Sequence, residues 1–442
     1  EIVKKINSTG KIDFLNIIKG HIDTDPALTK VIPIQGMPTA PHLDFAGEVK
    51  KMVNIPIFHA SKINDISTAR YAIESGKLDM VGMTRAHIAD PYIIKKLINK
   101  EEEKIRPCVG ATYCLDRIYE GKDTLCIHNP ATGREKFMPH LLKKKVSGLK
   151  KIIIVGAGPA GLEAARVCSE QGHSVTVFEA SDKPGGQINL ITRSKRRKDM
   201  AGIIDWRIGI CEANKVKFNF NSFASKEEIL SENPDIVIIA TGGIPNTDIL
   251  NEGSDLVVST WDILSGNVNI EDDVILYDDG GNYPGLQAAE MISSETSKLE
   301  IVTPERFFSP DIGGMNFVPY GKNFYEKNVK ISLNSRVKSV FRKGNRLGVK
   351  ISSDYSDLTF EKETSQVIVE HGTSPVDDLY FELKDQSKNL GQVDYKSLIK
   401  GLNKEIIKNK KGDFFLFRVG DAISSRNIHA AIYDSLRICK DF

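Results

Sequence analysis

The glycine-rich turn in "KKIIIVGAGPAGLEAARVCSEQGHSVTVFEA", residues 150–180, constrains the fold more than any other stretch of the chain. An apolar run leads into Gly156, Gly158 and Gly161, which have GxGxxG spacing, and a helical pattern follows. Glycine lets the backbone turn sharply against a pyrophosphate, and the first N–H groups of the next helix bind its phosphates. Glu179 ends the second apolar run, where a carboxylate accepts hydrogen bonds from ribose hydroxyls. The stretch therefore predicts a βαβ unit that binds a nucleotide.

Apolar strands alternate with helical stretches on both sides of this turn. Before it, we expect strands at 12–18, 55–61 and 78–85 and helices at 42–53, 65–76 and 90–103, the last capped by Asp90. After it, we expect strands at 234–243, 272–279, 299–304, 365–372 and 414–422. Such alternation is typical of parallel strands covered by helices. The chain therefore reads as α/β.

Composition narrows the class of protein. A length of 442 residues allows two or three domains, and a net charge of +2 offers no basic excess for nucleic acid. No apolar run reaches the ~20 residues of a membrane span. Six cysteines make no disulfide scaffold, which favours a cytoplasmic protein. The chain begins at Glu1 inside what reads as an element, so we expect a fragment of a longer protein.

Half of the cysteines fall in "RPCVGATYCLDRIYEGKDTLC", residues 106–126. Cys108, Cys114 and Cys126 are thiolate donors, and three of them in one loop suggest a metal centre. Zinc sites usually carry paired C-x2-4-C units, which this stretch lacks. A disulfide is disfavoured by the expected compartment. Three unrelated buried cysteines are the alternative to a metal site.

A second glycine-rich turn lies in "VILYDDGGNYPGLQAAE", residues 274–290. Gly280 and Gly285 match the first and last glycines of the earlier turn, whereas Asn282 replaces the middle one. Asp279 adds a carboxylate where a pyrophosphate would be repelled, and the strand at 299–304 ends without an acid. The second turn therefore predicts a degenerate NAD(P) site.

Three later motifs identify the nucleotide. "GGQ" at 185–187, "ATGG" at 240–243 and "VGDA" at 419–422 resemble the FAD-binding domains of flavoprotein disulfide reductases. The resemblance implies FAD, or ADP alone, as the ligand. The residues that it implies for binding are Gly156, Gly158, Gly161, Glu179, Gly186, Gln187, Thr241, Gly242, Gly420 and Asp421.

The cysteine stretch resembles the linker of the trimethylamine dehydrogenase and 2,4-dienoyl-CoA reductase family of NADH:flavin oxidoreductases. In that family the run C-x2-C-x2-3-C-x11-C ligates a 4Fe-4S cluster. Cys108, Cys114 and Cys126 match three ligands, and Ala111 stands at the fourth position. The resemblance implies a 4Fe-4S or 3Fe-4S cluster, with loss of the cluster as the alternative. The longer pattern "RPCVGATYCLDRIYEG…LCIHNPATGRE" is most similar to the dimethylglycine demethylase branch.

The family's N-terminal domain is a TIM barrel that holds FMN, and the three early strands resemble its strands six, seven and eight. The FMN phosphate would then be bound by Lys62, Gly82 and Arg85. The upstream strands, which carry the family's catalytic side chains, are not in this chain, so we assign no catalytic base. Candidates for substrate contact, and equally for an exposed loop, are Asn16, Lys19 and His21.

The resemblance implies four segments: 1–103 for the last three βα units of the barrel, 104–149 for the cysteine linker, 150–253 with 365–442 for the FAD-binding domain, and 254–364 for the degenerate NAD(P)-binding domain. It implies oxidative N-demethylation of a small methylated amine such as dimethylglycine, with release of formaldehyde. Electrons would pass through FMN and the cluster to an electron-transfer flavoprotein, and a homodimer is possible. The alternatives are an NAD(P)H-dependent enoate or dienoyl-CoA reductase, and a non-enzymatic FAD-binding or electron-carrier subunit whose barrel strands belong to another polypeptide.

Overall fold

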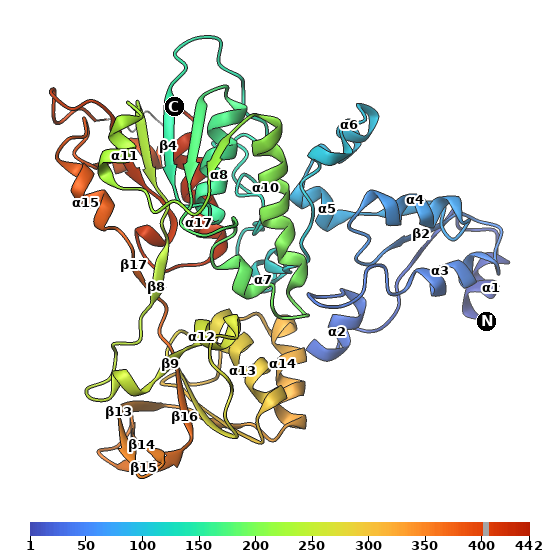
Figure 1. Ribbon diagram of the computed structural model, residues 1–442. Helices are drawn as coiled ribbons and strands as arrows, with labels where there is room; N and C mark the ends of the chain where they lie inside the picture. The colour runs from blue at the N-terminus through green and yellow to red at the C-terminus, as the bar shows by residue number, and fades with distance from the viewer. Residues whose placement is uncertain (401–405) are drawn as a thin grey trace.

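A computed structural model of the chain describes residues 1–400 and 406–442, and it has three units built on parallel sheets (Figure 1). The N-terminal unit lies to one side, and the two larger units lie one above the other. Within the described residues, no helix combines the length and apolar character that crossing a membrane requires. The α/β architecture expected from the sequence is confirmed.

The N-terminal unit has a parallel sheet in the order β1-β2-β3, formed by Leu15–Ile17, Ile57–Ala60 and Met80–Gly82. Its helices are α1 (Ile2–Asn7), α2 (Asp25–Val31), α3 (Leu43–Lys50), α4 (Ile66–Glu74), α5 (Thr84–Ala89) and α6 (Ile93–Ile98). Ile57 on the central strand packs with Ala46 of α3 and Ala72 of α4 in one buried cluster. Each apolar strand therefore buries one face under the helix that follows or precedes it.

The helix expected over 90–103 is shorter than predicted, and Asp90 does not cap it. Asp90 ends α5, and its buried carboxylate accepts a hydrogen bond from the Arg106 N–H at 2.8 Å and pairs with Lys96 at 2.6 Å. A buried carboxylate must be paired or hydrogen-bonded. The other oxygen of Asp90 accepts the Tyr92 N–H at 3.0 Å, and the bond from Arg106 joins the start of the cysteine segment to the N-terminal unit. A short 3₁₀ helix, η1 (Glu102–Lys104), and α7 (Tyr113–Tyr119) follow.

The first large unit contains the glycine-rich turn. Its parallel sheet has the order β18-β7-β4-β5-β6, formed by Phe415–Arg418, Ile236–Ile239, Lys151–Val155, Ser174–Phe178 and Lys217–Asn219. Side chains of β4 alternate between two buried clusters, with Ile152 in one and Ile153 in the other. Alternation of this kind requires helices on both faces of the sheet.

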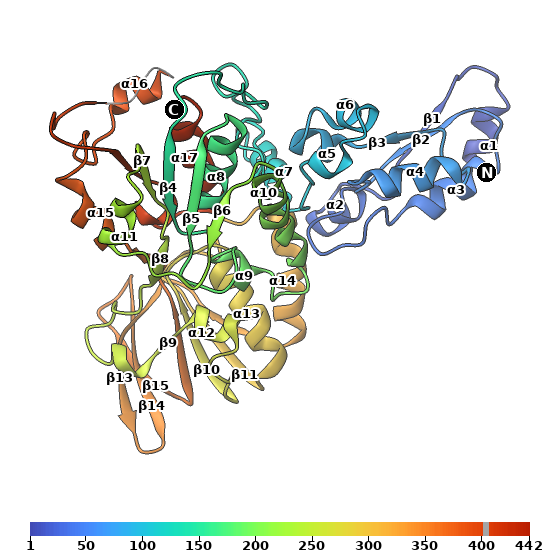
Figure 2. The same ribbon diagram turned by 45° about the horizontal axis from the view of Figure 1, so that its top comes forward.

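Helices cover both faces of this sheet (Figure 2). α8 (Pro159–Glu170), α10 (Gly202–Ala213) and α17 (Ile428–Cys439) pack in the larger cluster, and α11 (Lys226–Ser231) and α15 (Asp378–Lys384) pack in the other. The shorter elements are α9 (Ile188–Ile191), η2 (Lys198–Ala201), α16 (Tyr395–Ile399) and η4 (Gly420–Ala422). The sheet is therefore doubly wound.

The second large unit has a parallel sheet in the order β12-β11-β10-β16-β9, formed by Lys330–Ser332, Lys298–Val302, Asp273–Asp278, Gln366–Glu370 and Val258–Ser259. One face packs against α12 (Thr260–Ser265), α13 (Tyr283–Glu295) and α14 (Gly314–Glu326). The other face packs against an antiparallel sheet that sequence analysis did not anticipate. That sheet consists of β13 (Ser335–Lys343), β14 (Arg346–Ser353) and β15 (Thr359–Thr364).

The boundary expected at residue 365 is too early. β16 pairs with β10 and β9, so this strand belongs to the second unit, because its continuous apolar run is buried on both faces of that sheet. The chain returns through β17 (Thr373–Pro375), which pairs antiparallel with the outgoing β8 (Gly243–Pro245). The two crossings between the large units therefore run side by side. η3 (Ser254–Leu256) follows the outgoing crossing.

Candidate functional site

The first glycine-rich turn leaves its helix-facing edge free of side chains. Gly156 has φ +104°, and an added Cβ there would lie 2.4 Å from the Ala240 carbonyl oxygen. A Cβ on Gly161 would lie 1.9 Å from the Gly156 oxygen, so these two glycines permit close backbone packing. A Cβ on Gly158, by contrast, would meet no atom within 4 Å. The space beside Gly158, at the start of α8, is where a pyrophosphate would approach the helix.

Glu179 lies beside the same turn. Its carboxylate accepts a hydrogen bond from the Ala157 N–H at 2.6 Å and another from the Ser181 N–H at 2.9 Å. These bonds hold the carboxylate at the tip of β5. A carboxylate in this position can also accept hydrogen bonds from the two ribose hydroxyls of a nucleotide.

The other residues predicted to bind the nucleotide border this turn. An added Cβ on Gly186 would lie 3.2 Å from the Gly158 Cα, and the next residue, Gln187, donates to the Asp421 carboxylate at 2.9 Å. Burial raises the pKa of Asp421, and the hydrogen bond from Gln187 opposes that shift. Thr241 donates its hydroxyl to the Val376 carbonyl, which places it at the crossing between the large units. Gly242 and Gly420 adopt positive φ angles of +73° and +66°.

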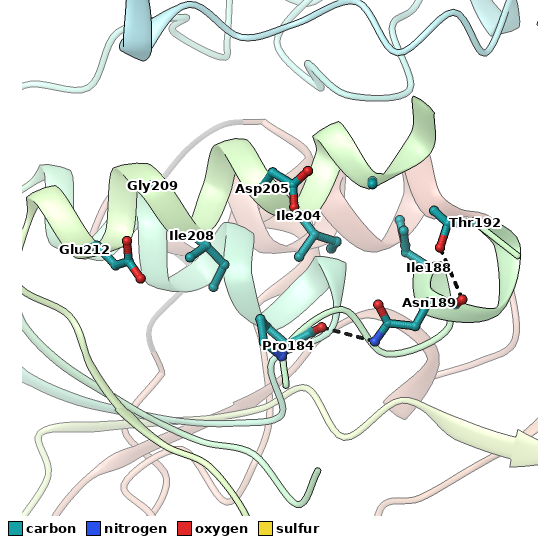
Figure 3. A pocket seen from close by; sticks show the side chains of 10 residues that line it. Pro184, Ile188, Asn189, Thr192, Ile204, Asp205, Ile208, Gly209 and Glu212 are labelled. Atoms are coloured by element: carbon teal, nitrogen blue, oxygen red, sulfur yellow. Dashed lines mark hydrogen bonds between the residues drawn. The ribbon is translucent and has the colours of Figure 1, made fainter. Parts of the chain in front are cut away.

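A cavity of about 430 Å³ lies beyond this turn, and sequence analysis did not anticipate it. Figure 3 shows α10 along one side and the segment 184–192 along the other. Ile204 and Ile208 give the helix side an apolar surface, and the carboxylates of Asp205 and Glu212 border it. None of the residues predicted to bind a cofactor lines this cavity. Its lining combines one face of α10 with the segment 184–192, and no sequence motif marks either of them.

The three loop cysteines line one small cavity together with Ala111 and Arg85. Burial raises the pKa of all three thiols, to about 12 for Cys114 and about 11 for Cys126. Thiols with such pKa values bind metal only where the positive charge of the metal ionises them. The loop backbone turns through left-handed conformations just before Cys114, at Gly110 and Thr112.

The arrangement of these thiols is wider than a single-ion site. Among the described residues, no three His, Cys, Asp or Glu side chains converge closely enough to hold one metal ion. An iron–sulfur cluster spreads its ligands over several iron atoms, so the donor set fits three corners of a cluster better than it fits zinc. The cavity that these thiols line encloses about 20 Å³.

A buried charged cluster lies behind the cysteine loop, and sequence analysis missed it. Arg166 and Arg207 both bind the fully buried Glu163, at 2.7 and 2.8 Å. Arg106 lies over the Trp206 ring at 4.4 Å, and its positive charge favours the thiolate form of Cys126. These side chains come from distant segments, so only the fold reveals the cluster.

The residues predicted to bind the FMN phosphate lie against the cysteine loop. Lys62 is buried with φ +52°, and its ammonium donates to the carbonyl of Ile34 at 3.1 Å and to that of Met37. Arg85 donates to the Pro33 carbonyl at 2.7 Å and lines the cysteine cavity. An added Cβ on Gly82 would lie 2.6 Å from the Ala60 Cβ, so glycine allows β2 and β3 to pack closely.

The three candidates for substrate contact lie at the exposed end of β1. The side chain of Asn16 points away from the core, and the Lys19 ammonium lies over the Phe45 ring at 5.0 Å. His21 pairs with Asp23 at the surface. The described residues bring none of these three together with the cysteines or the dinucleotide turn.

The second glycine-rich turn is filled by its own carboxylate, and the residue is Asp278, not the expected Asp279. Asp278 accepts hydrogen bonds from the Gly280 and Gly281 N–H groups at 3.0 and 3.2 Å. An added Cβ on Gly285 would lie 2.5 Å from the Asp278 Cγ. Asp279 turns away and pairs with His371 at 2.9 Å. Asp278 is therefore buried inside the turn, against Gly285, because the strand end directs its side chain inward.

Comparison with known proteins places the chain among flavoenzymes. Residues 154–206 match the family model described as "NAD(P)-binding Rossmann-like domain". The chain is 53% identical over 441 residues to a protein of Rhizobium meliloti (strain 1021) named "Probable N-methylproline demethylase". It is 41% identical over 448 residues to the "N,N-dimethylglycine/sarcosine dehydrogenase" of Chromohalobacter salexigens. These alignments cover 100% and 99% of the chain but 65% of each relative.

Solved structures share the fold over the whole chain. A 2-naphthoyl-CoA reductase complex matches with a TM-score of 0.82 and 25% identity, over 100% of this chain and 62% of that one. Histamine dehydrogenase from Rhizobium sp. 4-9 matches with a TM-score of 0.83 and 20% identity, over 100% of this chain and 63% of that one. The 442 residues therefore belong to the NADH:flavin oxidoreductase and trimethylamine dehydrogenase family, as the cysteine segment indicated.

Proposed function

We propose that this chain is part of a flavin-dependent demethylase that oxidises a small N-methylated amine such as dimethylglycine. The observation that carries the proposal is the packing of the three-cysteine loop against Lys62 and Arg85, beside the dinucleotide turn. It supports an arrangement in which a cluster site would lie between an FMN site and an FAD or ADP site. The similarity to the two demethylating relatives supports the choice of substrate class.

In the proposed reaction, an FMN held by Lys62 and Arg85 would supply the oxidant that removes a hydride equivalent from the N-methyl carbon. Water then adds to the resulting iminium carbon, and the adduct breaks down to the demethylated amine, formaldehyde and a proton. Electrons leave one at a time toward an electron-transfer flavoprotein. The protein would position the cofactors relative to the substrate and to one another for these transfers.

Each cofactor has proposed residues in this chain. Lys62 and Arg85 supply positive charge for the FMN phosphate, although both now donate to main-chain carbonyls. Gly158 leaves room for the pyrophosphate of FAD or ADP, and Glu179 is held beside it. The cysteine loop would hold a 4Fe-4S or 3Fe-4S cluster with Ala111 at the fourth corner. We propose the segment assignments 1–103 for the barrel part and 104–149 for the cluster linker.

The competing function is an NAD(P)H-dependent reductase, in which electrons run in the opposite direction. It requires a nicotinamide dinucleotide site in the second large unit. Asn282 disfavours one, since its side chain stands at the start of α13, where Gly158 of the first turn leaves room for a pyrophosphate. We therefore place the reductase second.

Anaerobic titration of the oxidised holoenzyme separates the two functions. We expect dimethylglycine to bleach the flavin absorbance within one turnover and NADH at the same concentration to leave it unchanged. Formaldehyde should form in equal amount to the bleached flavin. Bleaching by NADH alone would overturn the demethylase proposal in favour of the reductase.

A further inference from the structure

A column of three aromatic side chains leads away from the cysteine loop. The rings of Tyr113 and His429 have centroids 5.3 Å apart, and those of His429 and Tyr433 are stacked with centroids 6.2 Å apart. His429 and Tyr433 lie on α17, whereas Tyr113 is the first residue of α7. Both tyrosines are partly exposed, while the histidine between them is buried.

The column is joined to the cysteine loop at two points. Tyr113 directly precedes Cys114 in the chain, and a ring nitrogen of His429 lies 2.8 Å from the Cys126 carbonyl oxygen. A neutral ring that donates to this carbonyl through Nδ1 leaves Nε2 to accept from Arg134, 3.1 Å away. The rings are therefore fixed relative to two of the three thiols.

Three arginines surround the column without acidic partners. Arg134 and Arg437 lie over the Tyr433 ring at 4.3 and 4.9 Å, and Arg117 lies over Tyr113 at 5.9 Å. Arg117 and Arg134 donate to the carbonyls of Asp123 and Pro130. Across the described part of the chain, no carboxylate lies within 4.0 Å of these three guanidinium groups. Arg166 and Arg426, by contrast, each pair with an acid.

Unpaired positive charge of this kind favours an acidic partner. Complementary charge raises the rate of encounter between proteins and fixes their orientation. Arginine and tyrosine are also the residues enriched at the centres of protein interfaces. We propose that Tyr113, Tyr433 and the three arginines form the docking face for an acidic redox protein, which takes electrons from the cysteine site through the aromatic column. This proposal rests on the proposed function, because it assumes a cluster at the cysteines.

Charge-matched electron acceptors test the docking face. The holoenzyme is reduced with dithionite and mixed in stopped flow with ferricyanide, an anion, or with ferrocenium, a cation. We expect Arg437→Gln and Arg117→Gln each to lower the second-order rate constant with ferricyanide roughly threefold at low ionic strength. The rate with ferrocenium should not fall. Added salt should abolish the difference between variant and wild type.

A binding measurement provides a readout that does not need turnover. An acidic flavodoxin serves as the probe protein, and its affinity is measured with each variant at low salt. The matched control is Arg342→Gln, which removes the same charge from an exposed position on the β13–β14 hairpin of the other large unit. We expect weaker flavodoxin binding for Arg437→Gln than for Arg342→Gln. Equal effects of the two variants on flavodoxin affinity and on the ferricyanide rate would overturn the docking face.

The two proposals fail in different ways. Dithionite reduces the enzyme whatever its natural substrate, so the docking test stands even if dimethylglycine does not bleach the flavin. Conversely, bleaching by dimethylglycine with unaltered ferricyanide kinetics in every variant would keep the demethylase and reject this exit face.

Discussion

Two glycines of the first turn have opposite constraints, although they lie three residues apart. Gly158 borders open space on the ligand side, whereas Gly161 packs against the backbone of Gly156. A methyl group at Gly158 would therefore enter the space that the ligand needs. A methyl group at Gly161 would instead clash with the Gly156 backbone. The two substitutions separate binding from folding.

We expect Gly158→Ala to lower the affinity for FAD or ADP about tenfold, or ~1.4 kcal/mol. Its melting temperature without nucleotide should stay within about 2 °C of wild type, since no protein atom is displaced. Gly161→Ala should instead destabilise the fold by about 2 kcal/mol or more. Nucleotide released on denaturation and thermal melts check both outcomes. Retention of nucleotide by Gly158→Ala would reject the site.

Ala111 decides how many thiolates the cysteine loop offers. Its methyl group lines the same cavity as the three thiols. We expect Ala111→Cys to raise the iron and acid-labile sulfide content toward about four atoms of each per chain, because clusters of this kind favour four thiolates. Ala111→Ser is the control of similar size without a thiolate. Equal iron in the two variants would count against Ala111 as the missing ligand position.

At the residue scale, motifs with a fixed spacing in the sequence could be predicted, whereas pairs of distant side chains could not. Glycines at GxGxxG spacing and cysteines in one loop point to backbone and metal contacts that are local in sequence. The fold does bring Cys108, Cys114 and Cys126 to one cavity. Arg207 and Glu163 form their pair only because α8 and α10 pack together, and no local pattern marks such a pair. Asp279 does not enter the second turn, because side chains alternate at a strand end and Asp278 is the one that faces the turn.

At the element scale, the turn between β10 and α13 holds a buried carboxylate, that of Asp278. The Asp278 carboxylate accepts the N–H groups that open the turn, and its second oxygen has no hydrogen-bond partner. Burial raises the pKa of Asp278 to about 7, and the nearby Glu370 adds to the shift. A carboxyl group held in this way is most favourable to folding when it is protonated.

The sign of the pH effect follows from this shift. The unfolded pKa of an aspartate is about 3.9, so between roughly pH 4 and pH 7 the folded state binds more protons than the unfolded state. Stability from this group therefore falls as pH rises through that window. Asp278→Asn removes the ionisable group and keeps an oxygen acceptor for Gly280.

We expect Asp278→Asn to raise the free energy of unfolding at pH 8 by on the order of 2 kcal/mol and to change it little at pH 4.5. Denaturant unfolding at the two pH values measures the difference. Asp279→Asn is the matched control, because that carboxylate pairs with His371 near the surface. A gain at pH 8 that is no larger for Asp278→Asn than for Asp279→Asn would contradict the account of the turn.

At the scale of the whole molecule, strand–helix alternation predicted the α/β class and most of the parallel strands. The antiparallel sheet β13–β15 was not predicted. β14 carries Leu347, Val349 and Ile351 at alternate positions, but β15 (Thr359–Thr364) is polar and mostly exposed. The boundary at 365 was misplaced because a buried strand such as β16 reads the same in either sheet. Which sheet a strand joins depends on pairing partners that a sequence pattern does not specify.

The paired crossings β8 and β17 also bear on the order in which the chain folds. β7 and β18 are neighbours in the first sheet, yet the whole second unit lies between them in sequence. Bringing distant strands together costs loop-closure entropy that grows by about 0.6 kcal/mol for each doubling of the loop. If the second unit folds first, its two ends meet at β8 and β17 and the effective loop becomes short. The last strand of the first sheet then pairs late. Folding of the first large unit is therefore completed only after the second large unit has folded.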